Sequence, residues 1–215
     1  MIKCAIFDFD GTLANSMALW RNVGEGYLRS IGIEPKEDAD AKLKELRVET
    51  ASQYFVDEYK LDMTKEQVLK GITGFVRDRY MYDVTLKDGL VEFLQTLKEK
   101  NIKTAVATAN DLDLIGVVLK KYDVEKYFDE MINCEMVGAD KTEPKIFEEA
   151  MKLLGGSKDD TVIFEDAYYA IKTAKNADFK VVGVYDEVED EPDKVKEIVD
   201  LYIEDYKDIE EILKV

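Results

Sequence analysis

The hydrophobic pattern of this chain alternates between short apolar runs and longer stretches with helical spacing. The short runs are rich in Val, Ile, Ala and Phe, which is typical of strands covered on both faces. An apolar run from Ile2 predicts the first strand, and further strands are predicted at 103–107, 131–132, 161–164, 180–184 and 201–203. Helical spacing predicts helices at 89–100, 112–122, 144–154, 168–176, 193–199 and 208–213. Repeated strand–helix units predict an α/β fold with a doubly wound parallel sheet.

A segment without strand-like runs interrupts this alternation after the first strand. Its predicted helices cover 16–31, 39–46, 50–59 and 65–82. Thr64 is a suitable N-cap for the last of them, because its hydroxyl can accept a backbone N–H. The pattern therefore predicts a core domain of residues 1–15 and 83–215 and an inserted all-helical domain of residues 16–82. We expect its aromatic residues to form the core of the insertion: Tyr54, Phe55, Tyr59, Tyr80 and Tyr82.

Composition excludes several classes of partner. The chain carries 30 Lys and Arg against 47 Asp and Glu, a formal net charge of −17, which repels nucleic acids and anionic membranes. No apolar run approaches the roughly 20 residues of a membrane span, and no signal peptide precedes the first strand. Cys4 and Cys134 lie far apart and are expected to be buried, reduced thiols. These observations predict a cytoplasmic protein, for which a monomer is the default expectation.

Polar side chains gather at the predicted carboxyl ends of the strands, where ligands bind in sheets of this kind. Asp8 and Asp10 end the first strand two positions apart, so both can lean toward one site, and Gly11 permits a sharp turn after them. The chain has no histidine, so carboxylates are the expected acid–base groups. Further candidates at strand ends or in neighbouring loops are Thr108, Ala109, Asn110, Lys141, Glu165 and Asp166.

Each of these residues also has an ordinary structural interpretation. Thr108, Asn110 or Asp111 can cap the following helix, and Glu165 with Asp166 can cap the helix at 168–176, because acids favour helix N-termini. A lysine in a polar loop is usually solvated. The common position of all of them at strand ends favours the functional interpretation of the set. By contrast, the acidic run at 186–193 is expected to be a solvated loop.

The motif DFDGT, a hydroxyl residue after a strand, a lysine before a helix that starts at proline, and a pair of acids occur in this order along nearly the whole chain. In this respect the chain resembles the haloacid dehalogenase superfamily. The segments KTEPKIF and IFEDAYYAIKTAKNA are most similar to its β-phosphoglucomutase-like phosphatases, and the helical insertion resembles a C1-type cap. The resemblance implies a Rossmann-like core and a Mg²⁺-dependent phosphatase of a small phosphorylated metabolite, with a sugar phosphate as the expected substrate.

The resemblance also implies catalytic roles. Asp8 would be the nucleophile that forms an aspartyl-phosphate, and Asp10 would protonate the leaving oxygen and later take a proton from water. Haloacid dehalogenases lack an aspartate at this second position, so Asp10 favours a phosphoester over a carbon–halogen bond. Thr108 and Lys141 would bind the transferring phosphoryl group. The neighbouring Ala109 and Asn110 complete the expected substrate-binding set: Thr108, Ala109, Asn110 and Lys141.

By the same resemblance, Mg²⁺ would be held by Asp8, the main-chain carbonyl of Asp10 and Asp166, with Glu165 nearby. A β-phosphoglucomutase-type mutase is an alternative, weakened because Trp20 stands about where mutases carry a histidine. A non-catalytic protein that binds a phosphorylated metabolite is a second alternative. Closure of the cap would exclude water and recognise the leaving group. Its candidate substrate contacts are Trp20, Arg47, Arg77 and Arg79.

Overall fold

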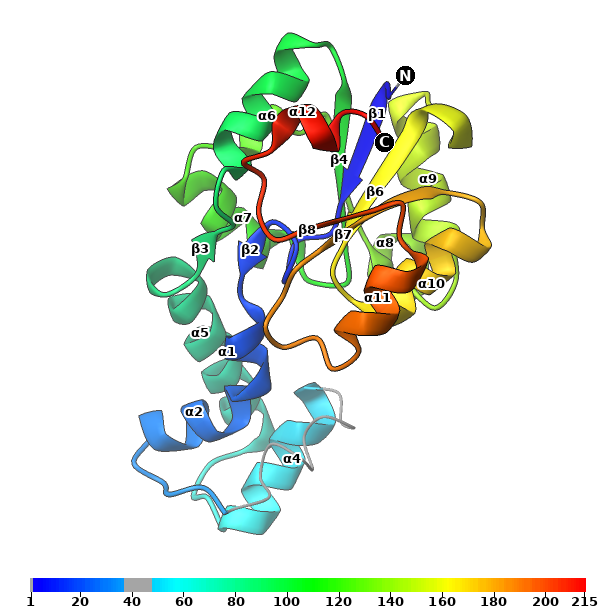
Figure 1. The fold of residues 1–215 in the computed structure, drawn as a ribbon. Coiled ribbons are helices and arrows are strands. Elements are labelled where there is room, and N and C mark those ends of the chain that lie inside the picture. The colour runs from blue at the N-terminus through cyan, green and yellow to red at the C-terminus, as the bar shows by residue number, and fades with distance from the viewer. Residues whose placement is uncertain (1, 37–47) are drawn as a thin grey trace. The chain divides into compact units, whose positions relative to one another are not determined.

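The computed structural model describes residues 2–36 and 48–215 (Figure 1). The chain divides into two compact units, one formed by Met1–Met17 with Val84–Val215 and the other by Ala18–Asp83. The helix predicted at 39–46 and the candidate Arg47 lie outside the described residues.

The first unit contains a six-stranded sheet with the order β5-β4-β1-β6-β7-β8, in which every neighbouring pair is parallel. Its strands are β1 Cys4–Phe7, β4 Lys103–Thr108, β5 Glu130–Asn133, β6 Thr161–Glu165, β7 Lys180–Val184 and β8 Leu201–Ile203. The predicted α/β fold with a doubly wound parallel sheet is thus confirmed. Because β1 lies between β4 and β6, the residues that follow these three strands meet at one edge of the sheet.

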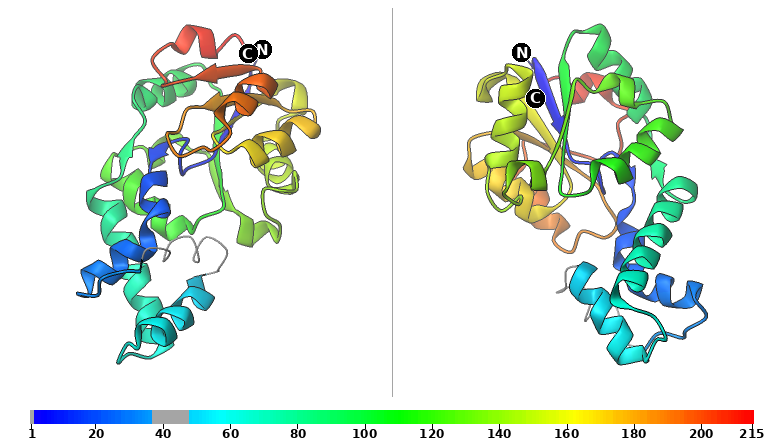
Figure 2. Two further views of the ribbon diagram at one scale, coloured as in Figure 1. Left: turned by 60° about the horizontal axis from the view of Figure 1, so that its bottom comes forward. Right: turned by 180° about the vertical axis from the view of Figure 1, so that it is seen from behind.

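Helices cover both faces of this sheet (Figure 2). Side chains of β1 alternate between the faces: Ile6 joins a buried cluster with Ile146 and Ile171, whereas the ring of Phe7 packs edge-on against Phe93. Large apolar side chains on both faces bury β1 completely and fix its register. The helices of this unit are α6 Leu90–Glu99, α7 Leu112–Lys121, α8 Cys134–Val137, α9 Lys145–Leu154, α10 Tyr168–Asn176, α11 Pro192–Ile198 and α12 Ile209–Ile212, with 3₁₀ turns at Glu125–Tyr127 and Lys158–Asp160.

The helices of the inserted segment are α1 Met17–Arg21, α2 Val23–Ser30, α4 Val48–Tyr59 and α5 Lys65–Tyr82. The single helix predicted at 16–31 is wrong in one respect, since it breaks at Asn22, close to Gly24 and Gly26, which have low helix propensity. The predicted cap of α5 is confirmed. The Thr64 hydroxyl accepts the Gln67 N–H at 3.2 Å, and the Gln67 side chain accepts the Thr64 N–H at 2.7 Å.

The aromatic residues of the insertion only partly follow the prediction. Phe55 and Tyr80 are buried, but Tyr82 is 78% exposed, so its assignment to the core is wrong. The buried side chains of α5 recur every four residues from Val68 to Tyr80. Tyr82 lies two positions further on, about 200° around a helix with 3.6 residues per turn, and therefore points away from the packed face.

A two-stranded antiparallel ladder, β2 Ala14–Asn15 with β3 Thr85–Leu86, was not predicted. Two residues per strand are too few to produce a recognisable alternation. The Asn15 side-chain amide reinforces the ladder by donating to Thr85 Oγ1 at 3.2 Å and to the Leu86 carbonyl at 3.3 Å. The ladder joins the two stretches where the chain leaves the first unit and returns to it. Across the described residues, no helix has the length and apolar character needed to cross a membrane.

Candidate active site

The site begins at the turn after β1. The Asp8 N–H donates to the Phe164 carbonyl at 3.0 Å, which continues the sheet ladder and fixes Asp8 at the strand end. Gly11 has a φ of +84°, a conformation that favours glycine. A Cβ atom on Gly11 would lie 2.2 Å from Asp166 Oδ2. Glycine is therefore required here both by the backbone conformation and by the close approach of Asp166.

This close approach predicts that Gly11→Ala destabilises the protein more than a glycine substitution at another position with positive φ. Gly155 is the matched control, because its φ is +72° but no heavy atom lies within 4 Å of a Cβ placed there. Gly155→Ala should cost about 1–2 kcal/mol of unfolding free energy for the left-handed conformation, and Gly11→Ala clearly more. Urea denaturation of both variants measures the difference. Equal losses would contradict a steric role of Asp166.

Three buried carboxylates form the centre of the site. Asp8, Glu165 and Asp166 each offer an oxygen within 4.8 Å of the others. The buried Lys141 ammonium donates to Asp8 Oδ1 and, at 2.8 Å, to Glu165 Oε2. The Thr12 hydroxyl donates to Asp166 Oδ1 at 2.8 Å. Within the described residues, one ammonium thus faces three buried carboxylates, so acidic groups outnumber basic ones in the cluster.

The pKa shifts express this imbalance. Burial raises the pKa of Asp8 to about 8; Lys141 opposes the shift, and Glu165 and Asp10 add to it. Burial also raises the pKa of Asp166 well above its usual range, with a contribution from Glu165. For Lys141, burial alone would lower the pKa, but the charges of Asp8 and Glu165 outweigh it and raise the pKa. An oxygen-rich, cation-poor cluster of this kind fits Mg²⁺, which prefers carboxylate ligands.

These shifts predict a pH-dependent stability. The pKa of Asp8 is about 8 in the folded protein against an ordinary 3.8, so the folded state binds more protons than the unfolded chain between these values. The stabilising contribution is complete below the lower value and is lost as the pH rises through the higher one. Without metal, the free energy of unfolding should fall between about pH 5 and about pH 8, and Mg²⁺ should flatten the curve.

Urea denaturation in EDTA and in Mg²⁺ across this range measures both effects. A stability that rises with pH in EDTA, or one that is insensitive to Mg²⁺ at the alkaline end, would contradict the inferred charge imbalance.

Asp10 is held by two neutral donors. The buried Ser16 hydroxyl donates to Asp10 Oδ1 at 2.6 Å, and the Asn110 amide donates to Asp10 Oδ2 at 2.9 Å. Sequence reasoning placed Ser16 in a helix and missed this contact. The sequence carried only a weak signal for this contact, namely the position of Ser16 just before α1, where its hydroxyl can bond to a group outside the helix.

The segment after β4 brings its predicted residues to the same region. Thr108 is buried, and its hydroxyl oxygen accepts the Asn110 N–H at 3.0 Å. Because that bond uses a lone pair, the Thr108 hydroxyl proton remains available to another acceptor. Ala109 is exposed and can offer only main-chain groups. Asp111 takes the capping role considered for this segment, as its carboxylate accepts the Asp113 N–H of α7 at 2.6 Å.

The capping alternative fails for the acids after β6. Glu165 Oε2 accepts from Lys141, and Glu165 Oε1 accepts only a long bond of 3.4 Å from the Ala167 N–H. Asp166 accepts from Thr12, and the Tyr168 N–H at the start of α10 donates to Glu189 Oε2 at 3.1 Å rather than to either acid. These carboxylates therefore face the lysine and the β1 turn rather than the helix.

One residue of the acidic run at 186–193 contradicts its predicted solvation. Asp186 is 6% exposed and pairs at 3.1 Å with Lys87, which is 8% exposed. Asp186 follows β7 as Asp8 follows β1, so the strand-end rule applied to β7 would have found it. The sequence carried no comparable signal for Lys87, because this residue lies just before the helix predicted at 89–100 and is 99 residues away from Asp186.

Comparisons with known proteins show the family and the fold. A sequence model of the family described as haloacid dehalogenase-like hydrolase matches residues 5–184. The chain is 27% identical over 222 residues to a protein of Caldanaerobacter subterraneus subsp. tengcongensis provisionally named pyrophosphatase PpaX, covering 99% of this chain and 95% of that protein. It is 25% identical over 205 residues to the phosphorylated carbohydrates phosphatase of Thermotoga maritima, covering 88% of each.

Among solved structures, a Thermotoga maritima protein provisionally named beta-phosphoglucomutase matches with a TM-score of 0.84 and 23% identity, covering 99% of both chains. At this level of identity the structural match shows a common fold.

Proposed function

This chain belongs to the haloacid dehalogenase-like hydrolase family, and from that membership we propose that it is a Mg²⁺-dependent phosphatase of a small phosphorylated metabolite, acting as a monomer. The observation that carries the proposal is the buried group of Asp8, Lys141, Glu165 and Asp166, which gathers where β1 and β6 end. The names of two relatives support a phosphorylated substrate, and one of them names phosphorylated carbohydrates, which favours a sugar phosphate.

The residues that would hold Mg²⁺ are Asp8, Glu165 and Asp166, together with the main-chain carbonyl of Asp10. When bound, the ion supplies positive charge that offsets the carboxylates and polarises the phosphoryl oxygens. The donor set fits this role, because all side-chain ligands are carboxylates and they lie within 4.8 Å of one another.

In the proposed reaction, a carboxylate oxygen of Asp8 attacks the phosphorus, and the bond to the leaving oxygen breaks. Asp10 protonates that oxygen, so the alcohol leaves and an aspartyl-phosphate remains. Asp10, now ionised, then accepts a proton from water, whose oxygen attacks the phosphorus and regenerates Asp8 with release of phosphate. The bonds from Ser16 and Asn110 orient Asp10 for both proton transfers.

Two further groups would stabilise the transferring phosphoryl group. The Thr108 hydroxyl has its proton free to donate, and the Lys141 ammonium already contacts Asp8. Both would interact with the equatorial oxygens as charge builds on them. A buried, positively charged lysine is needed because a dianionic substrate must enter a protein with a net charge of −17.

Substrate choice is proposed to reside in the helical segment at 16–82, acting as a cap. Of its candidate contacts, Arg77 is exposed. The Trp20 indole donates to the Tyr80 hydroxyl at 2.7 Å, and Arg79 pairs with Asp83 at 2.6 Å, so both have structural partners within the insertion. Arg77 is therefore the candidate we would substitute first when the best substrate is known.

The test is release of phosphate from a panel of sugar phosphates, nucleotides, pyrophosphate and other phosphorylated metabolites, in Mg²⁺ and in EDTA. Release that requires Mg²⁺ supports the phosphatase. Interconversion of hexose 1- and 6-phosphates with little free phosphate would replace it by a mutase. Binding of a phosphosugar without any turnover in Mg²⁺ would replace it by a non-catalytic binding protein.

A further inference from the structure

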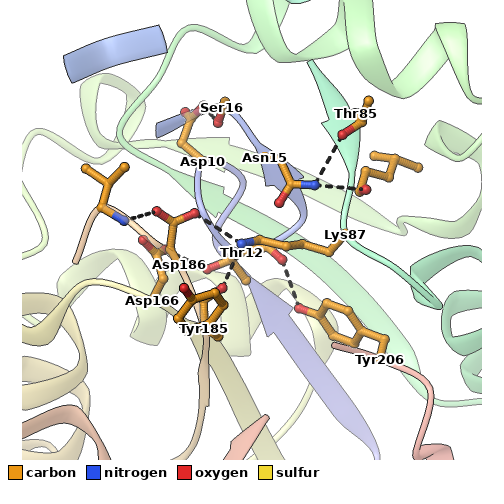
Figure 3. A network of polar contacts seen from close by, with 12 residues as sticks. Asp10, Thr12, Asn15, Ser16, Thr85, Lys87, Asp166, Tyr185, Asp186 and Tyr206 are labelled. Atoms are coloured by element: carbon orange, nitrogen blue, oxygen red, sulfur yellow. Dashed lines mark hydrogen bonds and ion pairs between the residues drawn. The ribbon is translucent and has the colours of Figure 1, made fainter. Parts of the chain in front are cut away.

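Lys87 is a buried lysine that the proposed chemistry does not use. Its ammonium donates to the Tyr185 carbonyl at 2.7 Å and to Asp186 Oδ2 at 3.1 Å, and the Lys87 and Asp186 side chains are only 7% and 5% exposed (Figure 3). Taking an ion pair out of water is costly, and hydrophobic side chains of similar volume usually serve stability at least as well. The pair is thus poorly explained as a device for stability alone.

The ion pair lies close to the carboxylates that are proposed to bind Mg²⁺. Asp186 follows β7, and β7 pairs with β6, which leads into Asp166. Figure 3 shows Asp186 beside Asp166, with Lys87 extending toward Asp186 from the segment that follows β3. The ion pair therefore ties the end of β7 to the segment through which the chain re-enters the first unit.

The same segment also holds the turn after β1. The Lys87 main-chain N–H donates to the Leu13 carbonyl at 3.0 Å, and the Tyr206 hydroxyl donates to the Thr12 carbonyl at 3.2 Å. Two successive carbonyls of the turn are thus held by two residues from distant parts of the chain. The Thr12 hydroxyl in turn donates to Asp166 Oδ1 at 2.8 Å.

The Tyr206 side chain is fixed by the aromatic residues packed around it. It is fully buried, and its ring packs against Phe93 at 5.2 Å and Phe164 at 6.0 Å between centroids. Packing would be satisfied equally by phenylalanine, so the hydroxyl is the distinctive part of the side chain. Its bond to Thr12 is directed at the turn that carries Asp10 and Gly11.

We propose that the Lys87–Asp186 ion pair and Tyr206 position the metal site. The ion pair anchors the segment whose Lys87 N–H holds the Leu13 carbonyl, and the Tyr206 hydroxyl holds the Thr12 carbonyl, so that the Thr12 hydroxyl orients Asp166. This inference rests on the proposed function in one point, the binding of Mg²⁺ by Asp166. Neither the ion pair nor Tyr206 touches the reacting atoms. Removal of a group that hydrogen-bonds directly to a metal ligand typically costs about 10-fold to 100-fold in metal affinity, and these residues act one step further out, so we expect the lower end of this range.

Two variants test the positioning role. Tyr206→Phe removes one oxygen and keeps the aromatic packing. Lys87→Met combined with Asp186→Asn removes the ion pair without changing the net charge, so a change in Mg²⁺ affinity cannot come from the overall field. The asparagine oxygen can still accept the Val188 N–H, which bonds to Asp186 at 2.9 Å. Lys87→Met alone is unsuitable, because it leaves the buried Asp186 charge unpaired.

The matched control is the double variant Lys207→Met with Asp88→Asn. These residues are the direct neighbours of Tyr206 and Lys87 in sequence, and they form an ion pair at 2.9 Å, but their side chains are 61% and 74% exposed. Breaking this pair also conserves net charge. It should leave Mg²⁺ binding unchanged.

Isothermal titration of each protein with Mg²⁺, without substrate, gives the dissociation constant, and circular dichroism verifies the fold. We expect the Mg²⁺ Kd to rise about 10-fold in both test variants, and turnover to recover when Mg²⁺ is raised to saturation. A Kd within about twofold of the wild type in Tyr206→Phe overturns the inference. If the double variant does not fold, Tyr206→Phe decides alone. Wild-type protein that binds no Mg²⁺ would instead overturn the proposed function.

Discussion

Asp8→Asn should abolish phosphate release while the protein remains folded. The amide cannot form an acyl-phosphate, so the covalent route is closed. We expect turnover to fall by about 10⁴-fold or more, the scale on which removal of a nucleophile acts. The side chain keeps its shape, and Lys141 keeps its second partner, Glu165, at 2.8 Å. Phosphate release and thermal melting measure the two expectations.

The stability of this variant has a definite sign. Burial raises the pKa of Asp8 to about 8, which means that the folded, metal-free protein resists ionisation of this carboxyl. Asparagine does not ionise, so Asp8→Asn should melt at or above the wild-type temperature in EDTA at alkaline pH. Asp111→Asn is the control, because asparagine retains the helix cap and leaves the chemistry untouched. Turnover of Asp8→Asn near that of the control would contradict the mechanism.

Lys141→Met is expected to damage both stability and turnover. Its ammonium is the shared partner of Asp8 and Glu165, and the side chains of Lys141 and Glu165 are each 2% exposed. Removing one member of a buried charge group leaves the others uncompensated, which typically costs about 3–5 kcal/mol. Turnover should fall by about 10²-fold to 10³-fold, because the transferring phosphoryl group also loses a charged donor.

Lys145→Met provides the comparison for this variant. Lys145 is exposed and donates to the Val137 carbonyl, so it differs from Lys141 mainly in burial and in its partners. Urea denaturation in EDTA should show a lower stability for Lys141→Met than for Lys145→Met. Mg²⁺ should recover part of the stability lost in Lys141→Met, because a bound cation offsets the negative charge of the buried carboxylates. If both variants unfold at the same denaturant concentration, the carboxylates do not depend on the ammonium.

The fold could be predicted because its strands are covered on both faces. The runs 103–107 and 180–184 end in consecutive apolar residues, at 105–107 and 181–184, rather than in an alternation. This pattern identifies them as strands of a parallel sheet without knowledge of their order. The grouping of Asp8 with Asp166 could be predicted for a related reason, since the ends of neighbouring parallel strands meet at one edge. The strand order itself, with β1 between β4 and β6, could not be obtained from periodicity.

The contacts that escaped prediction join loops that lie far apart in the sequence. Asp186 shares a run of acids with its neighbours, and nothing in the hydrophobic pattern distinguishes a buried carboxylate from solvated ones. Only its position two residues after β7 carried information. Ser16 was included in the helix predicted at 16–31, whereas its hydroxyl donates to Asp10. Side-chain direction in a turn depends on backbone angles that composition does not specify.

The short ladder of β2 and β3 has a consequence for protein engineering. Asn15 and Thr85 are paired residues, so their Cα atoms lie roughly 5 Å apart, as in any antiparallel pair. The helical insertion therefore begins and ends at adjacent points, and its removal would leave a gap that a tight hairpin turn can close. A segment joined in this way can be exchanged as a cassette. On the proposed role of the insertion as a cap, chimaeras that carry a relative's insertion on this core should acquire that relative's substrate preference, while the strands that hold the carboxylates stay unaltered.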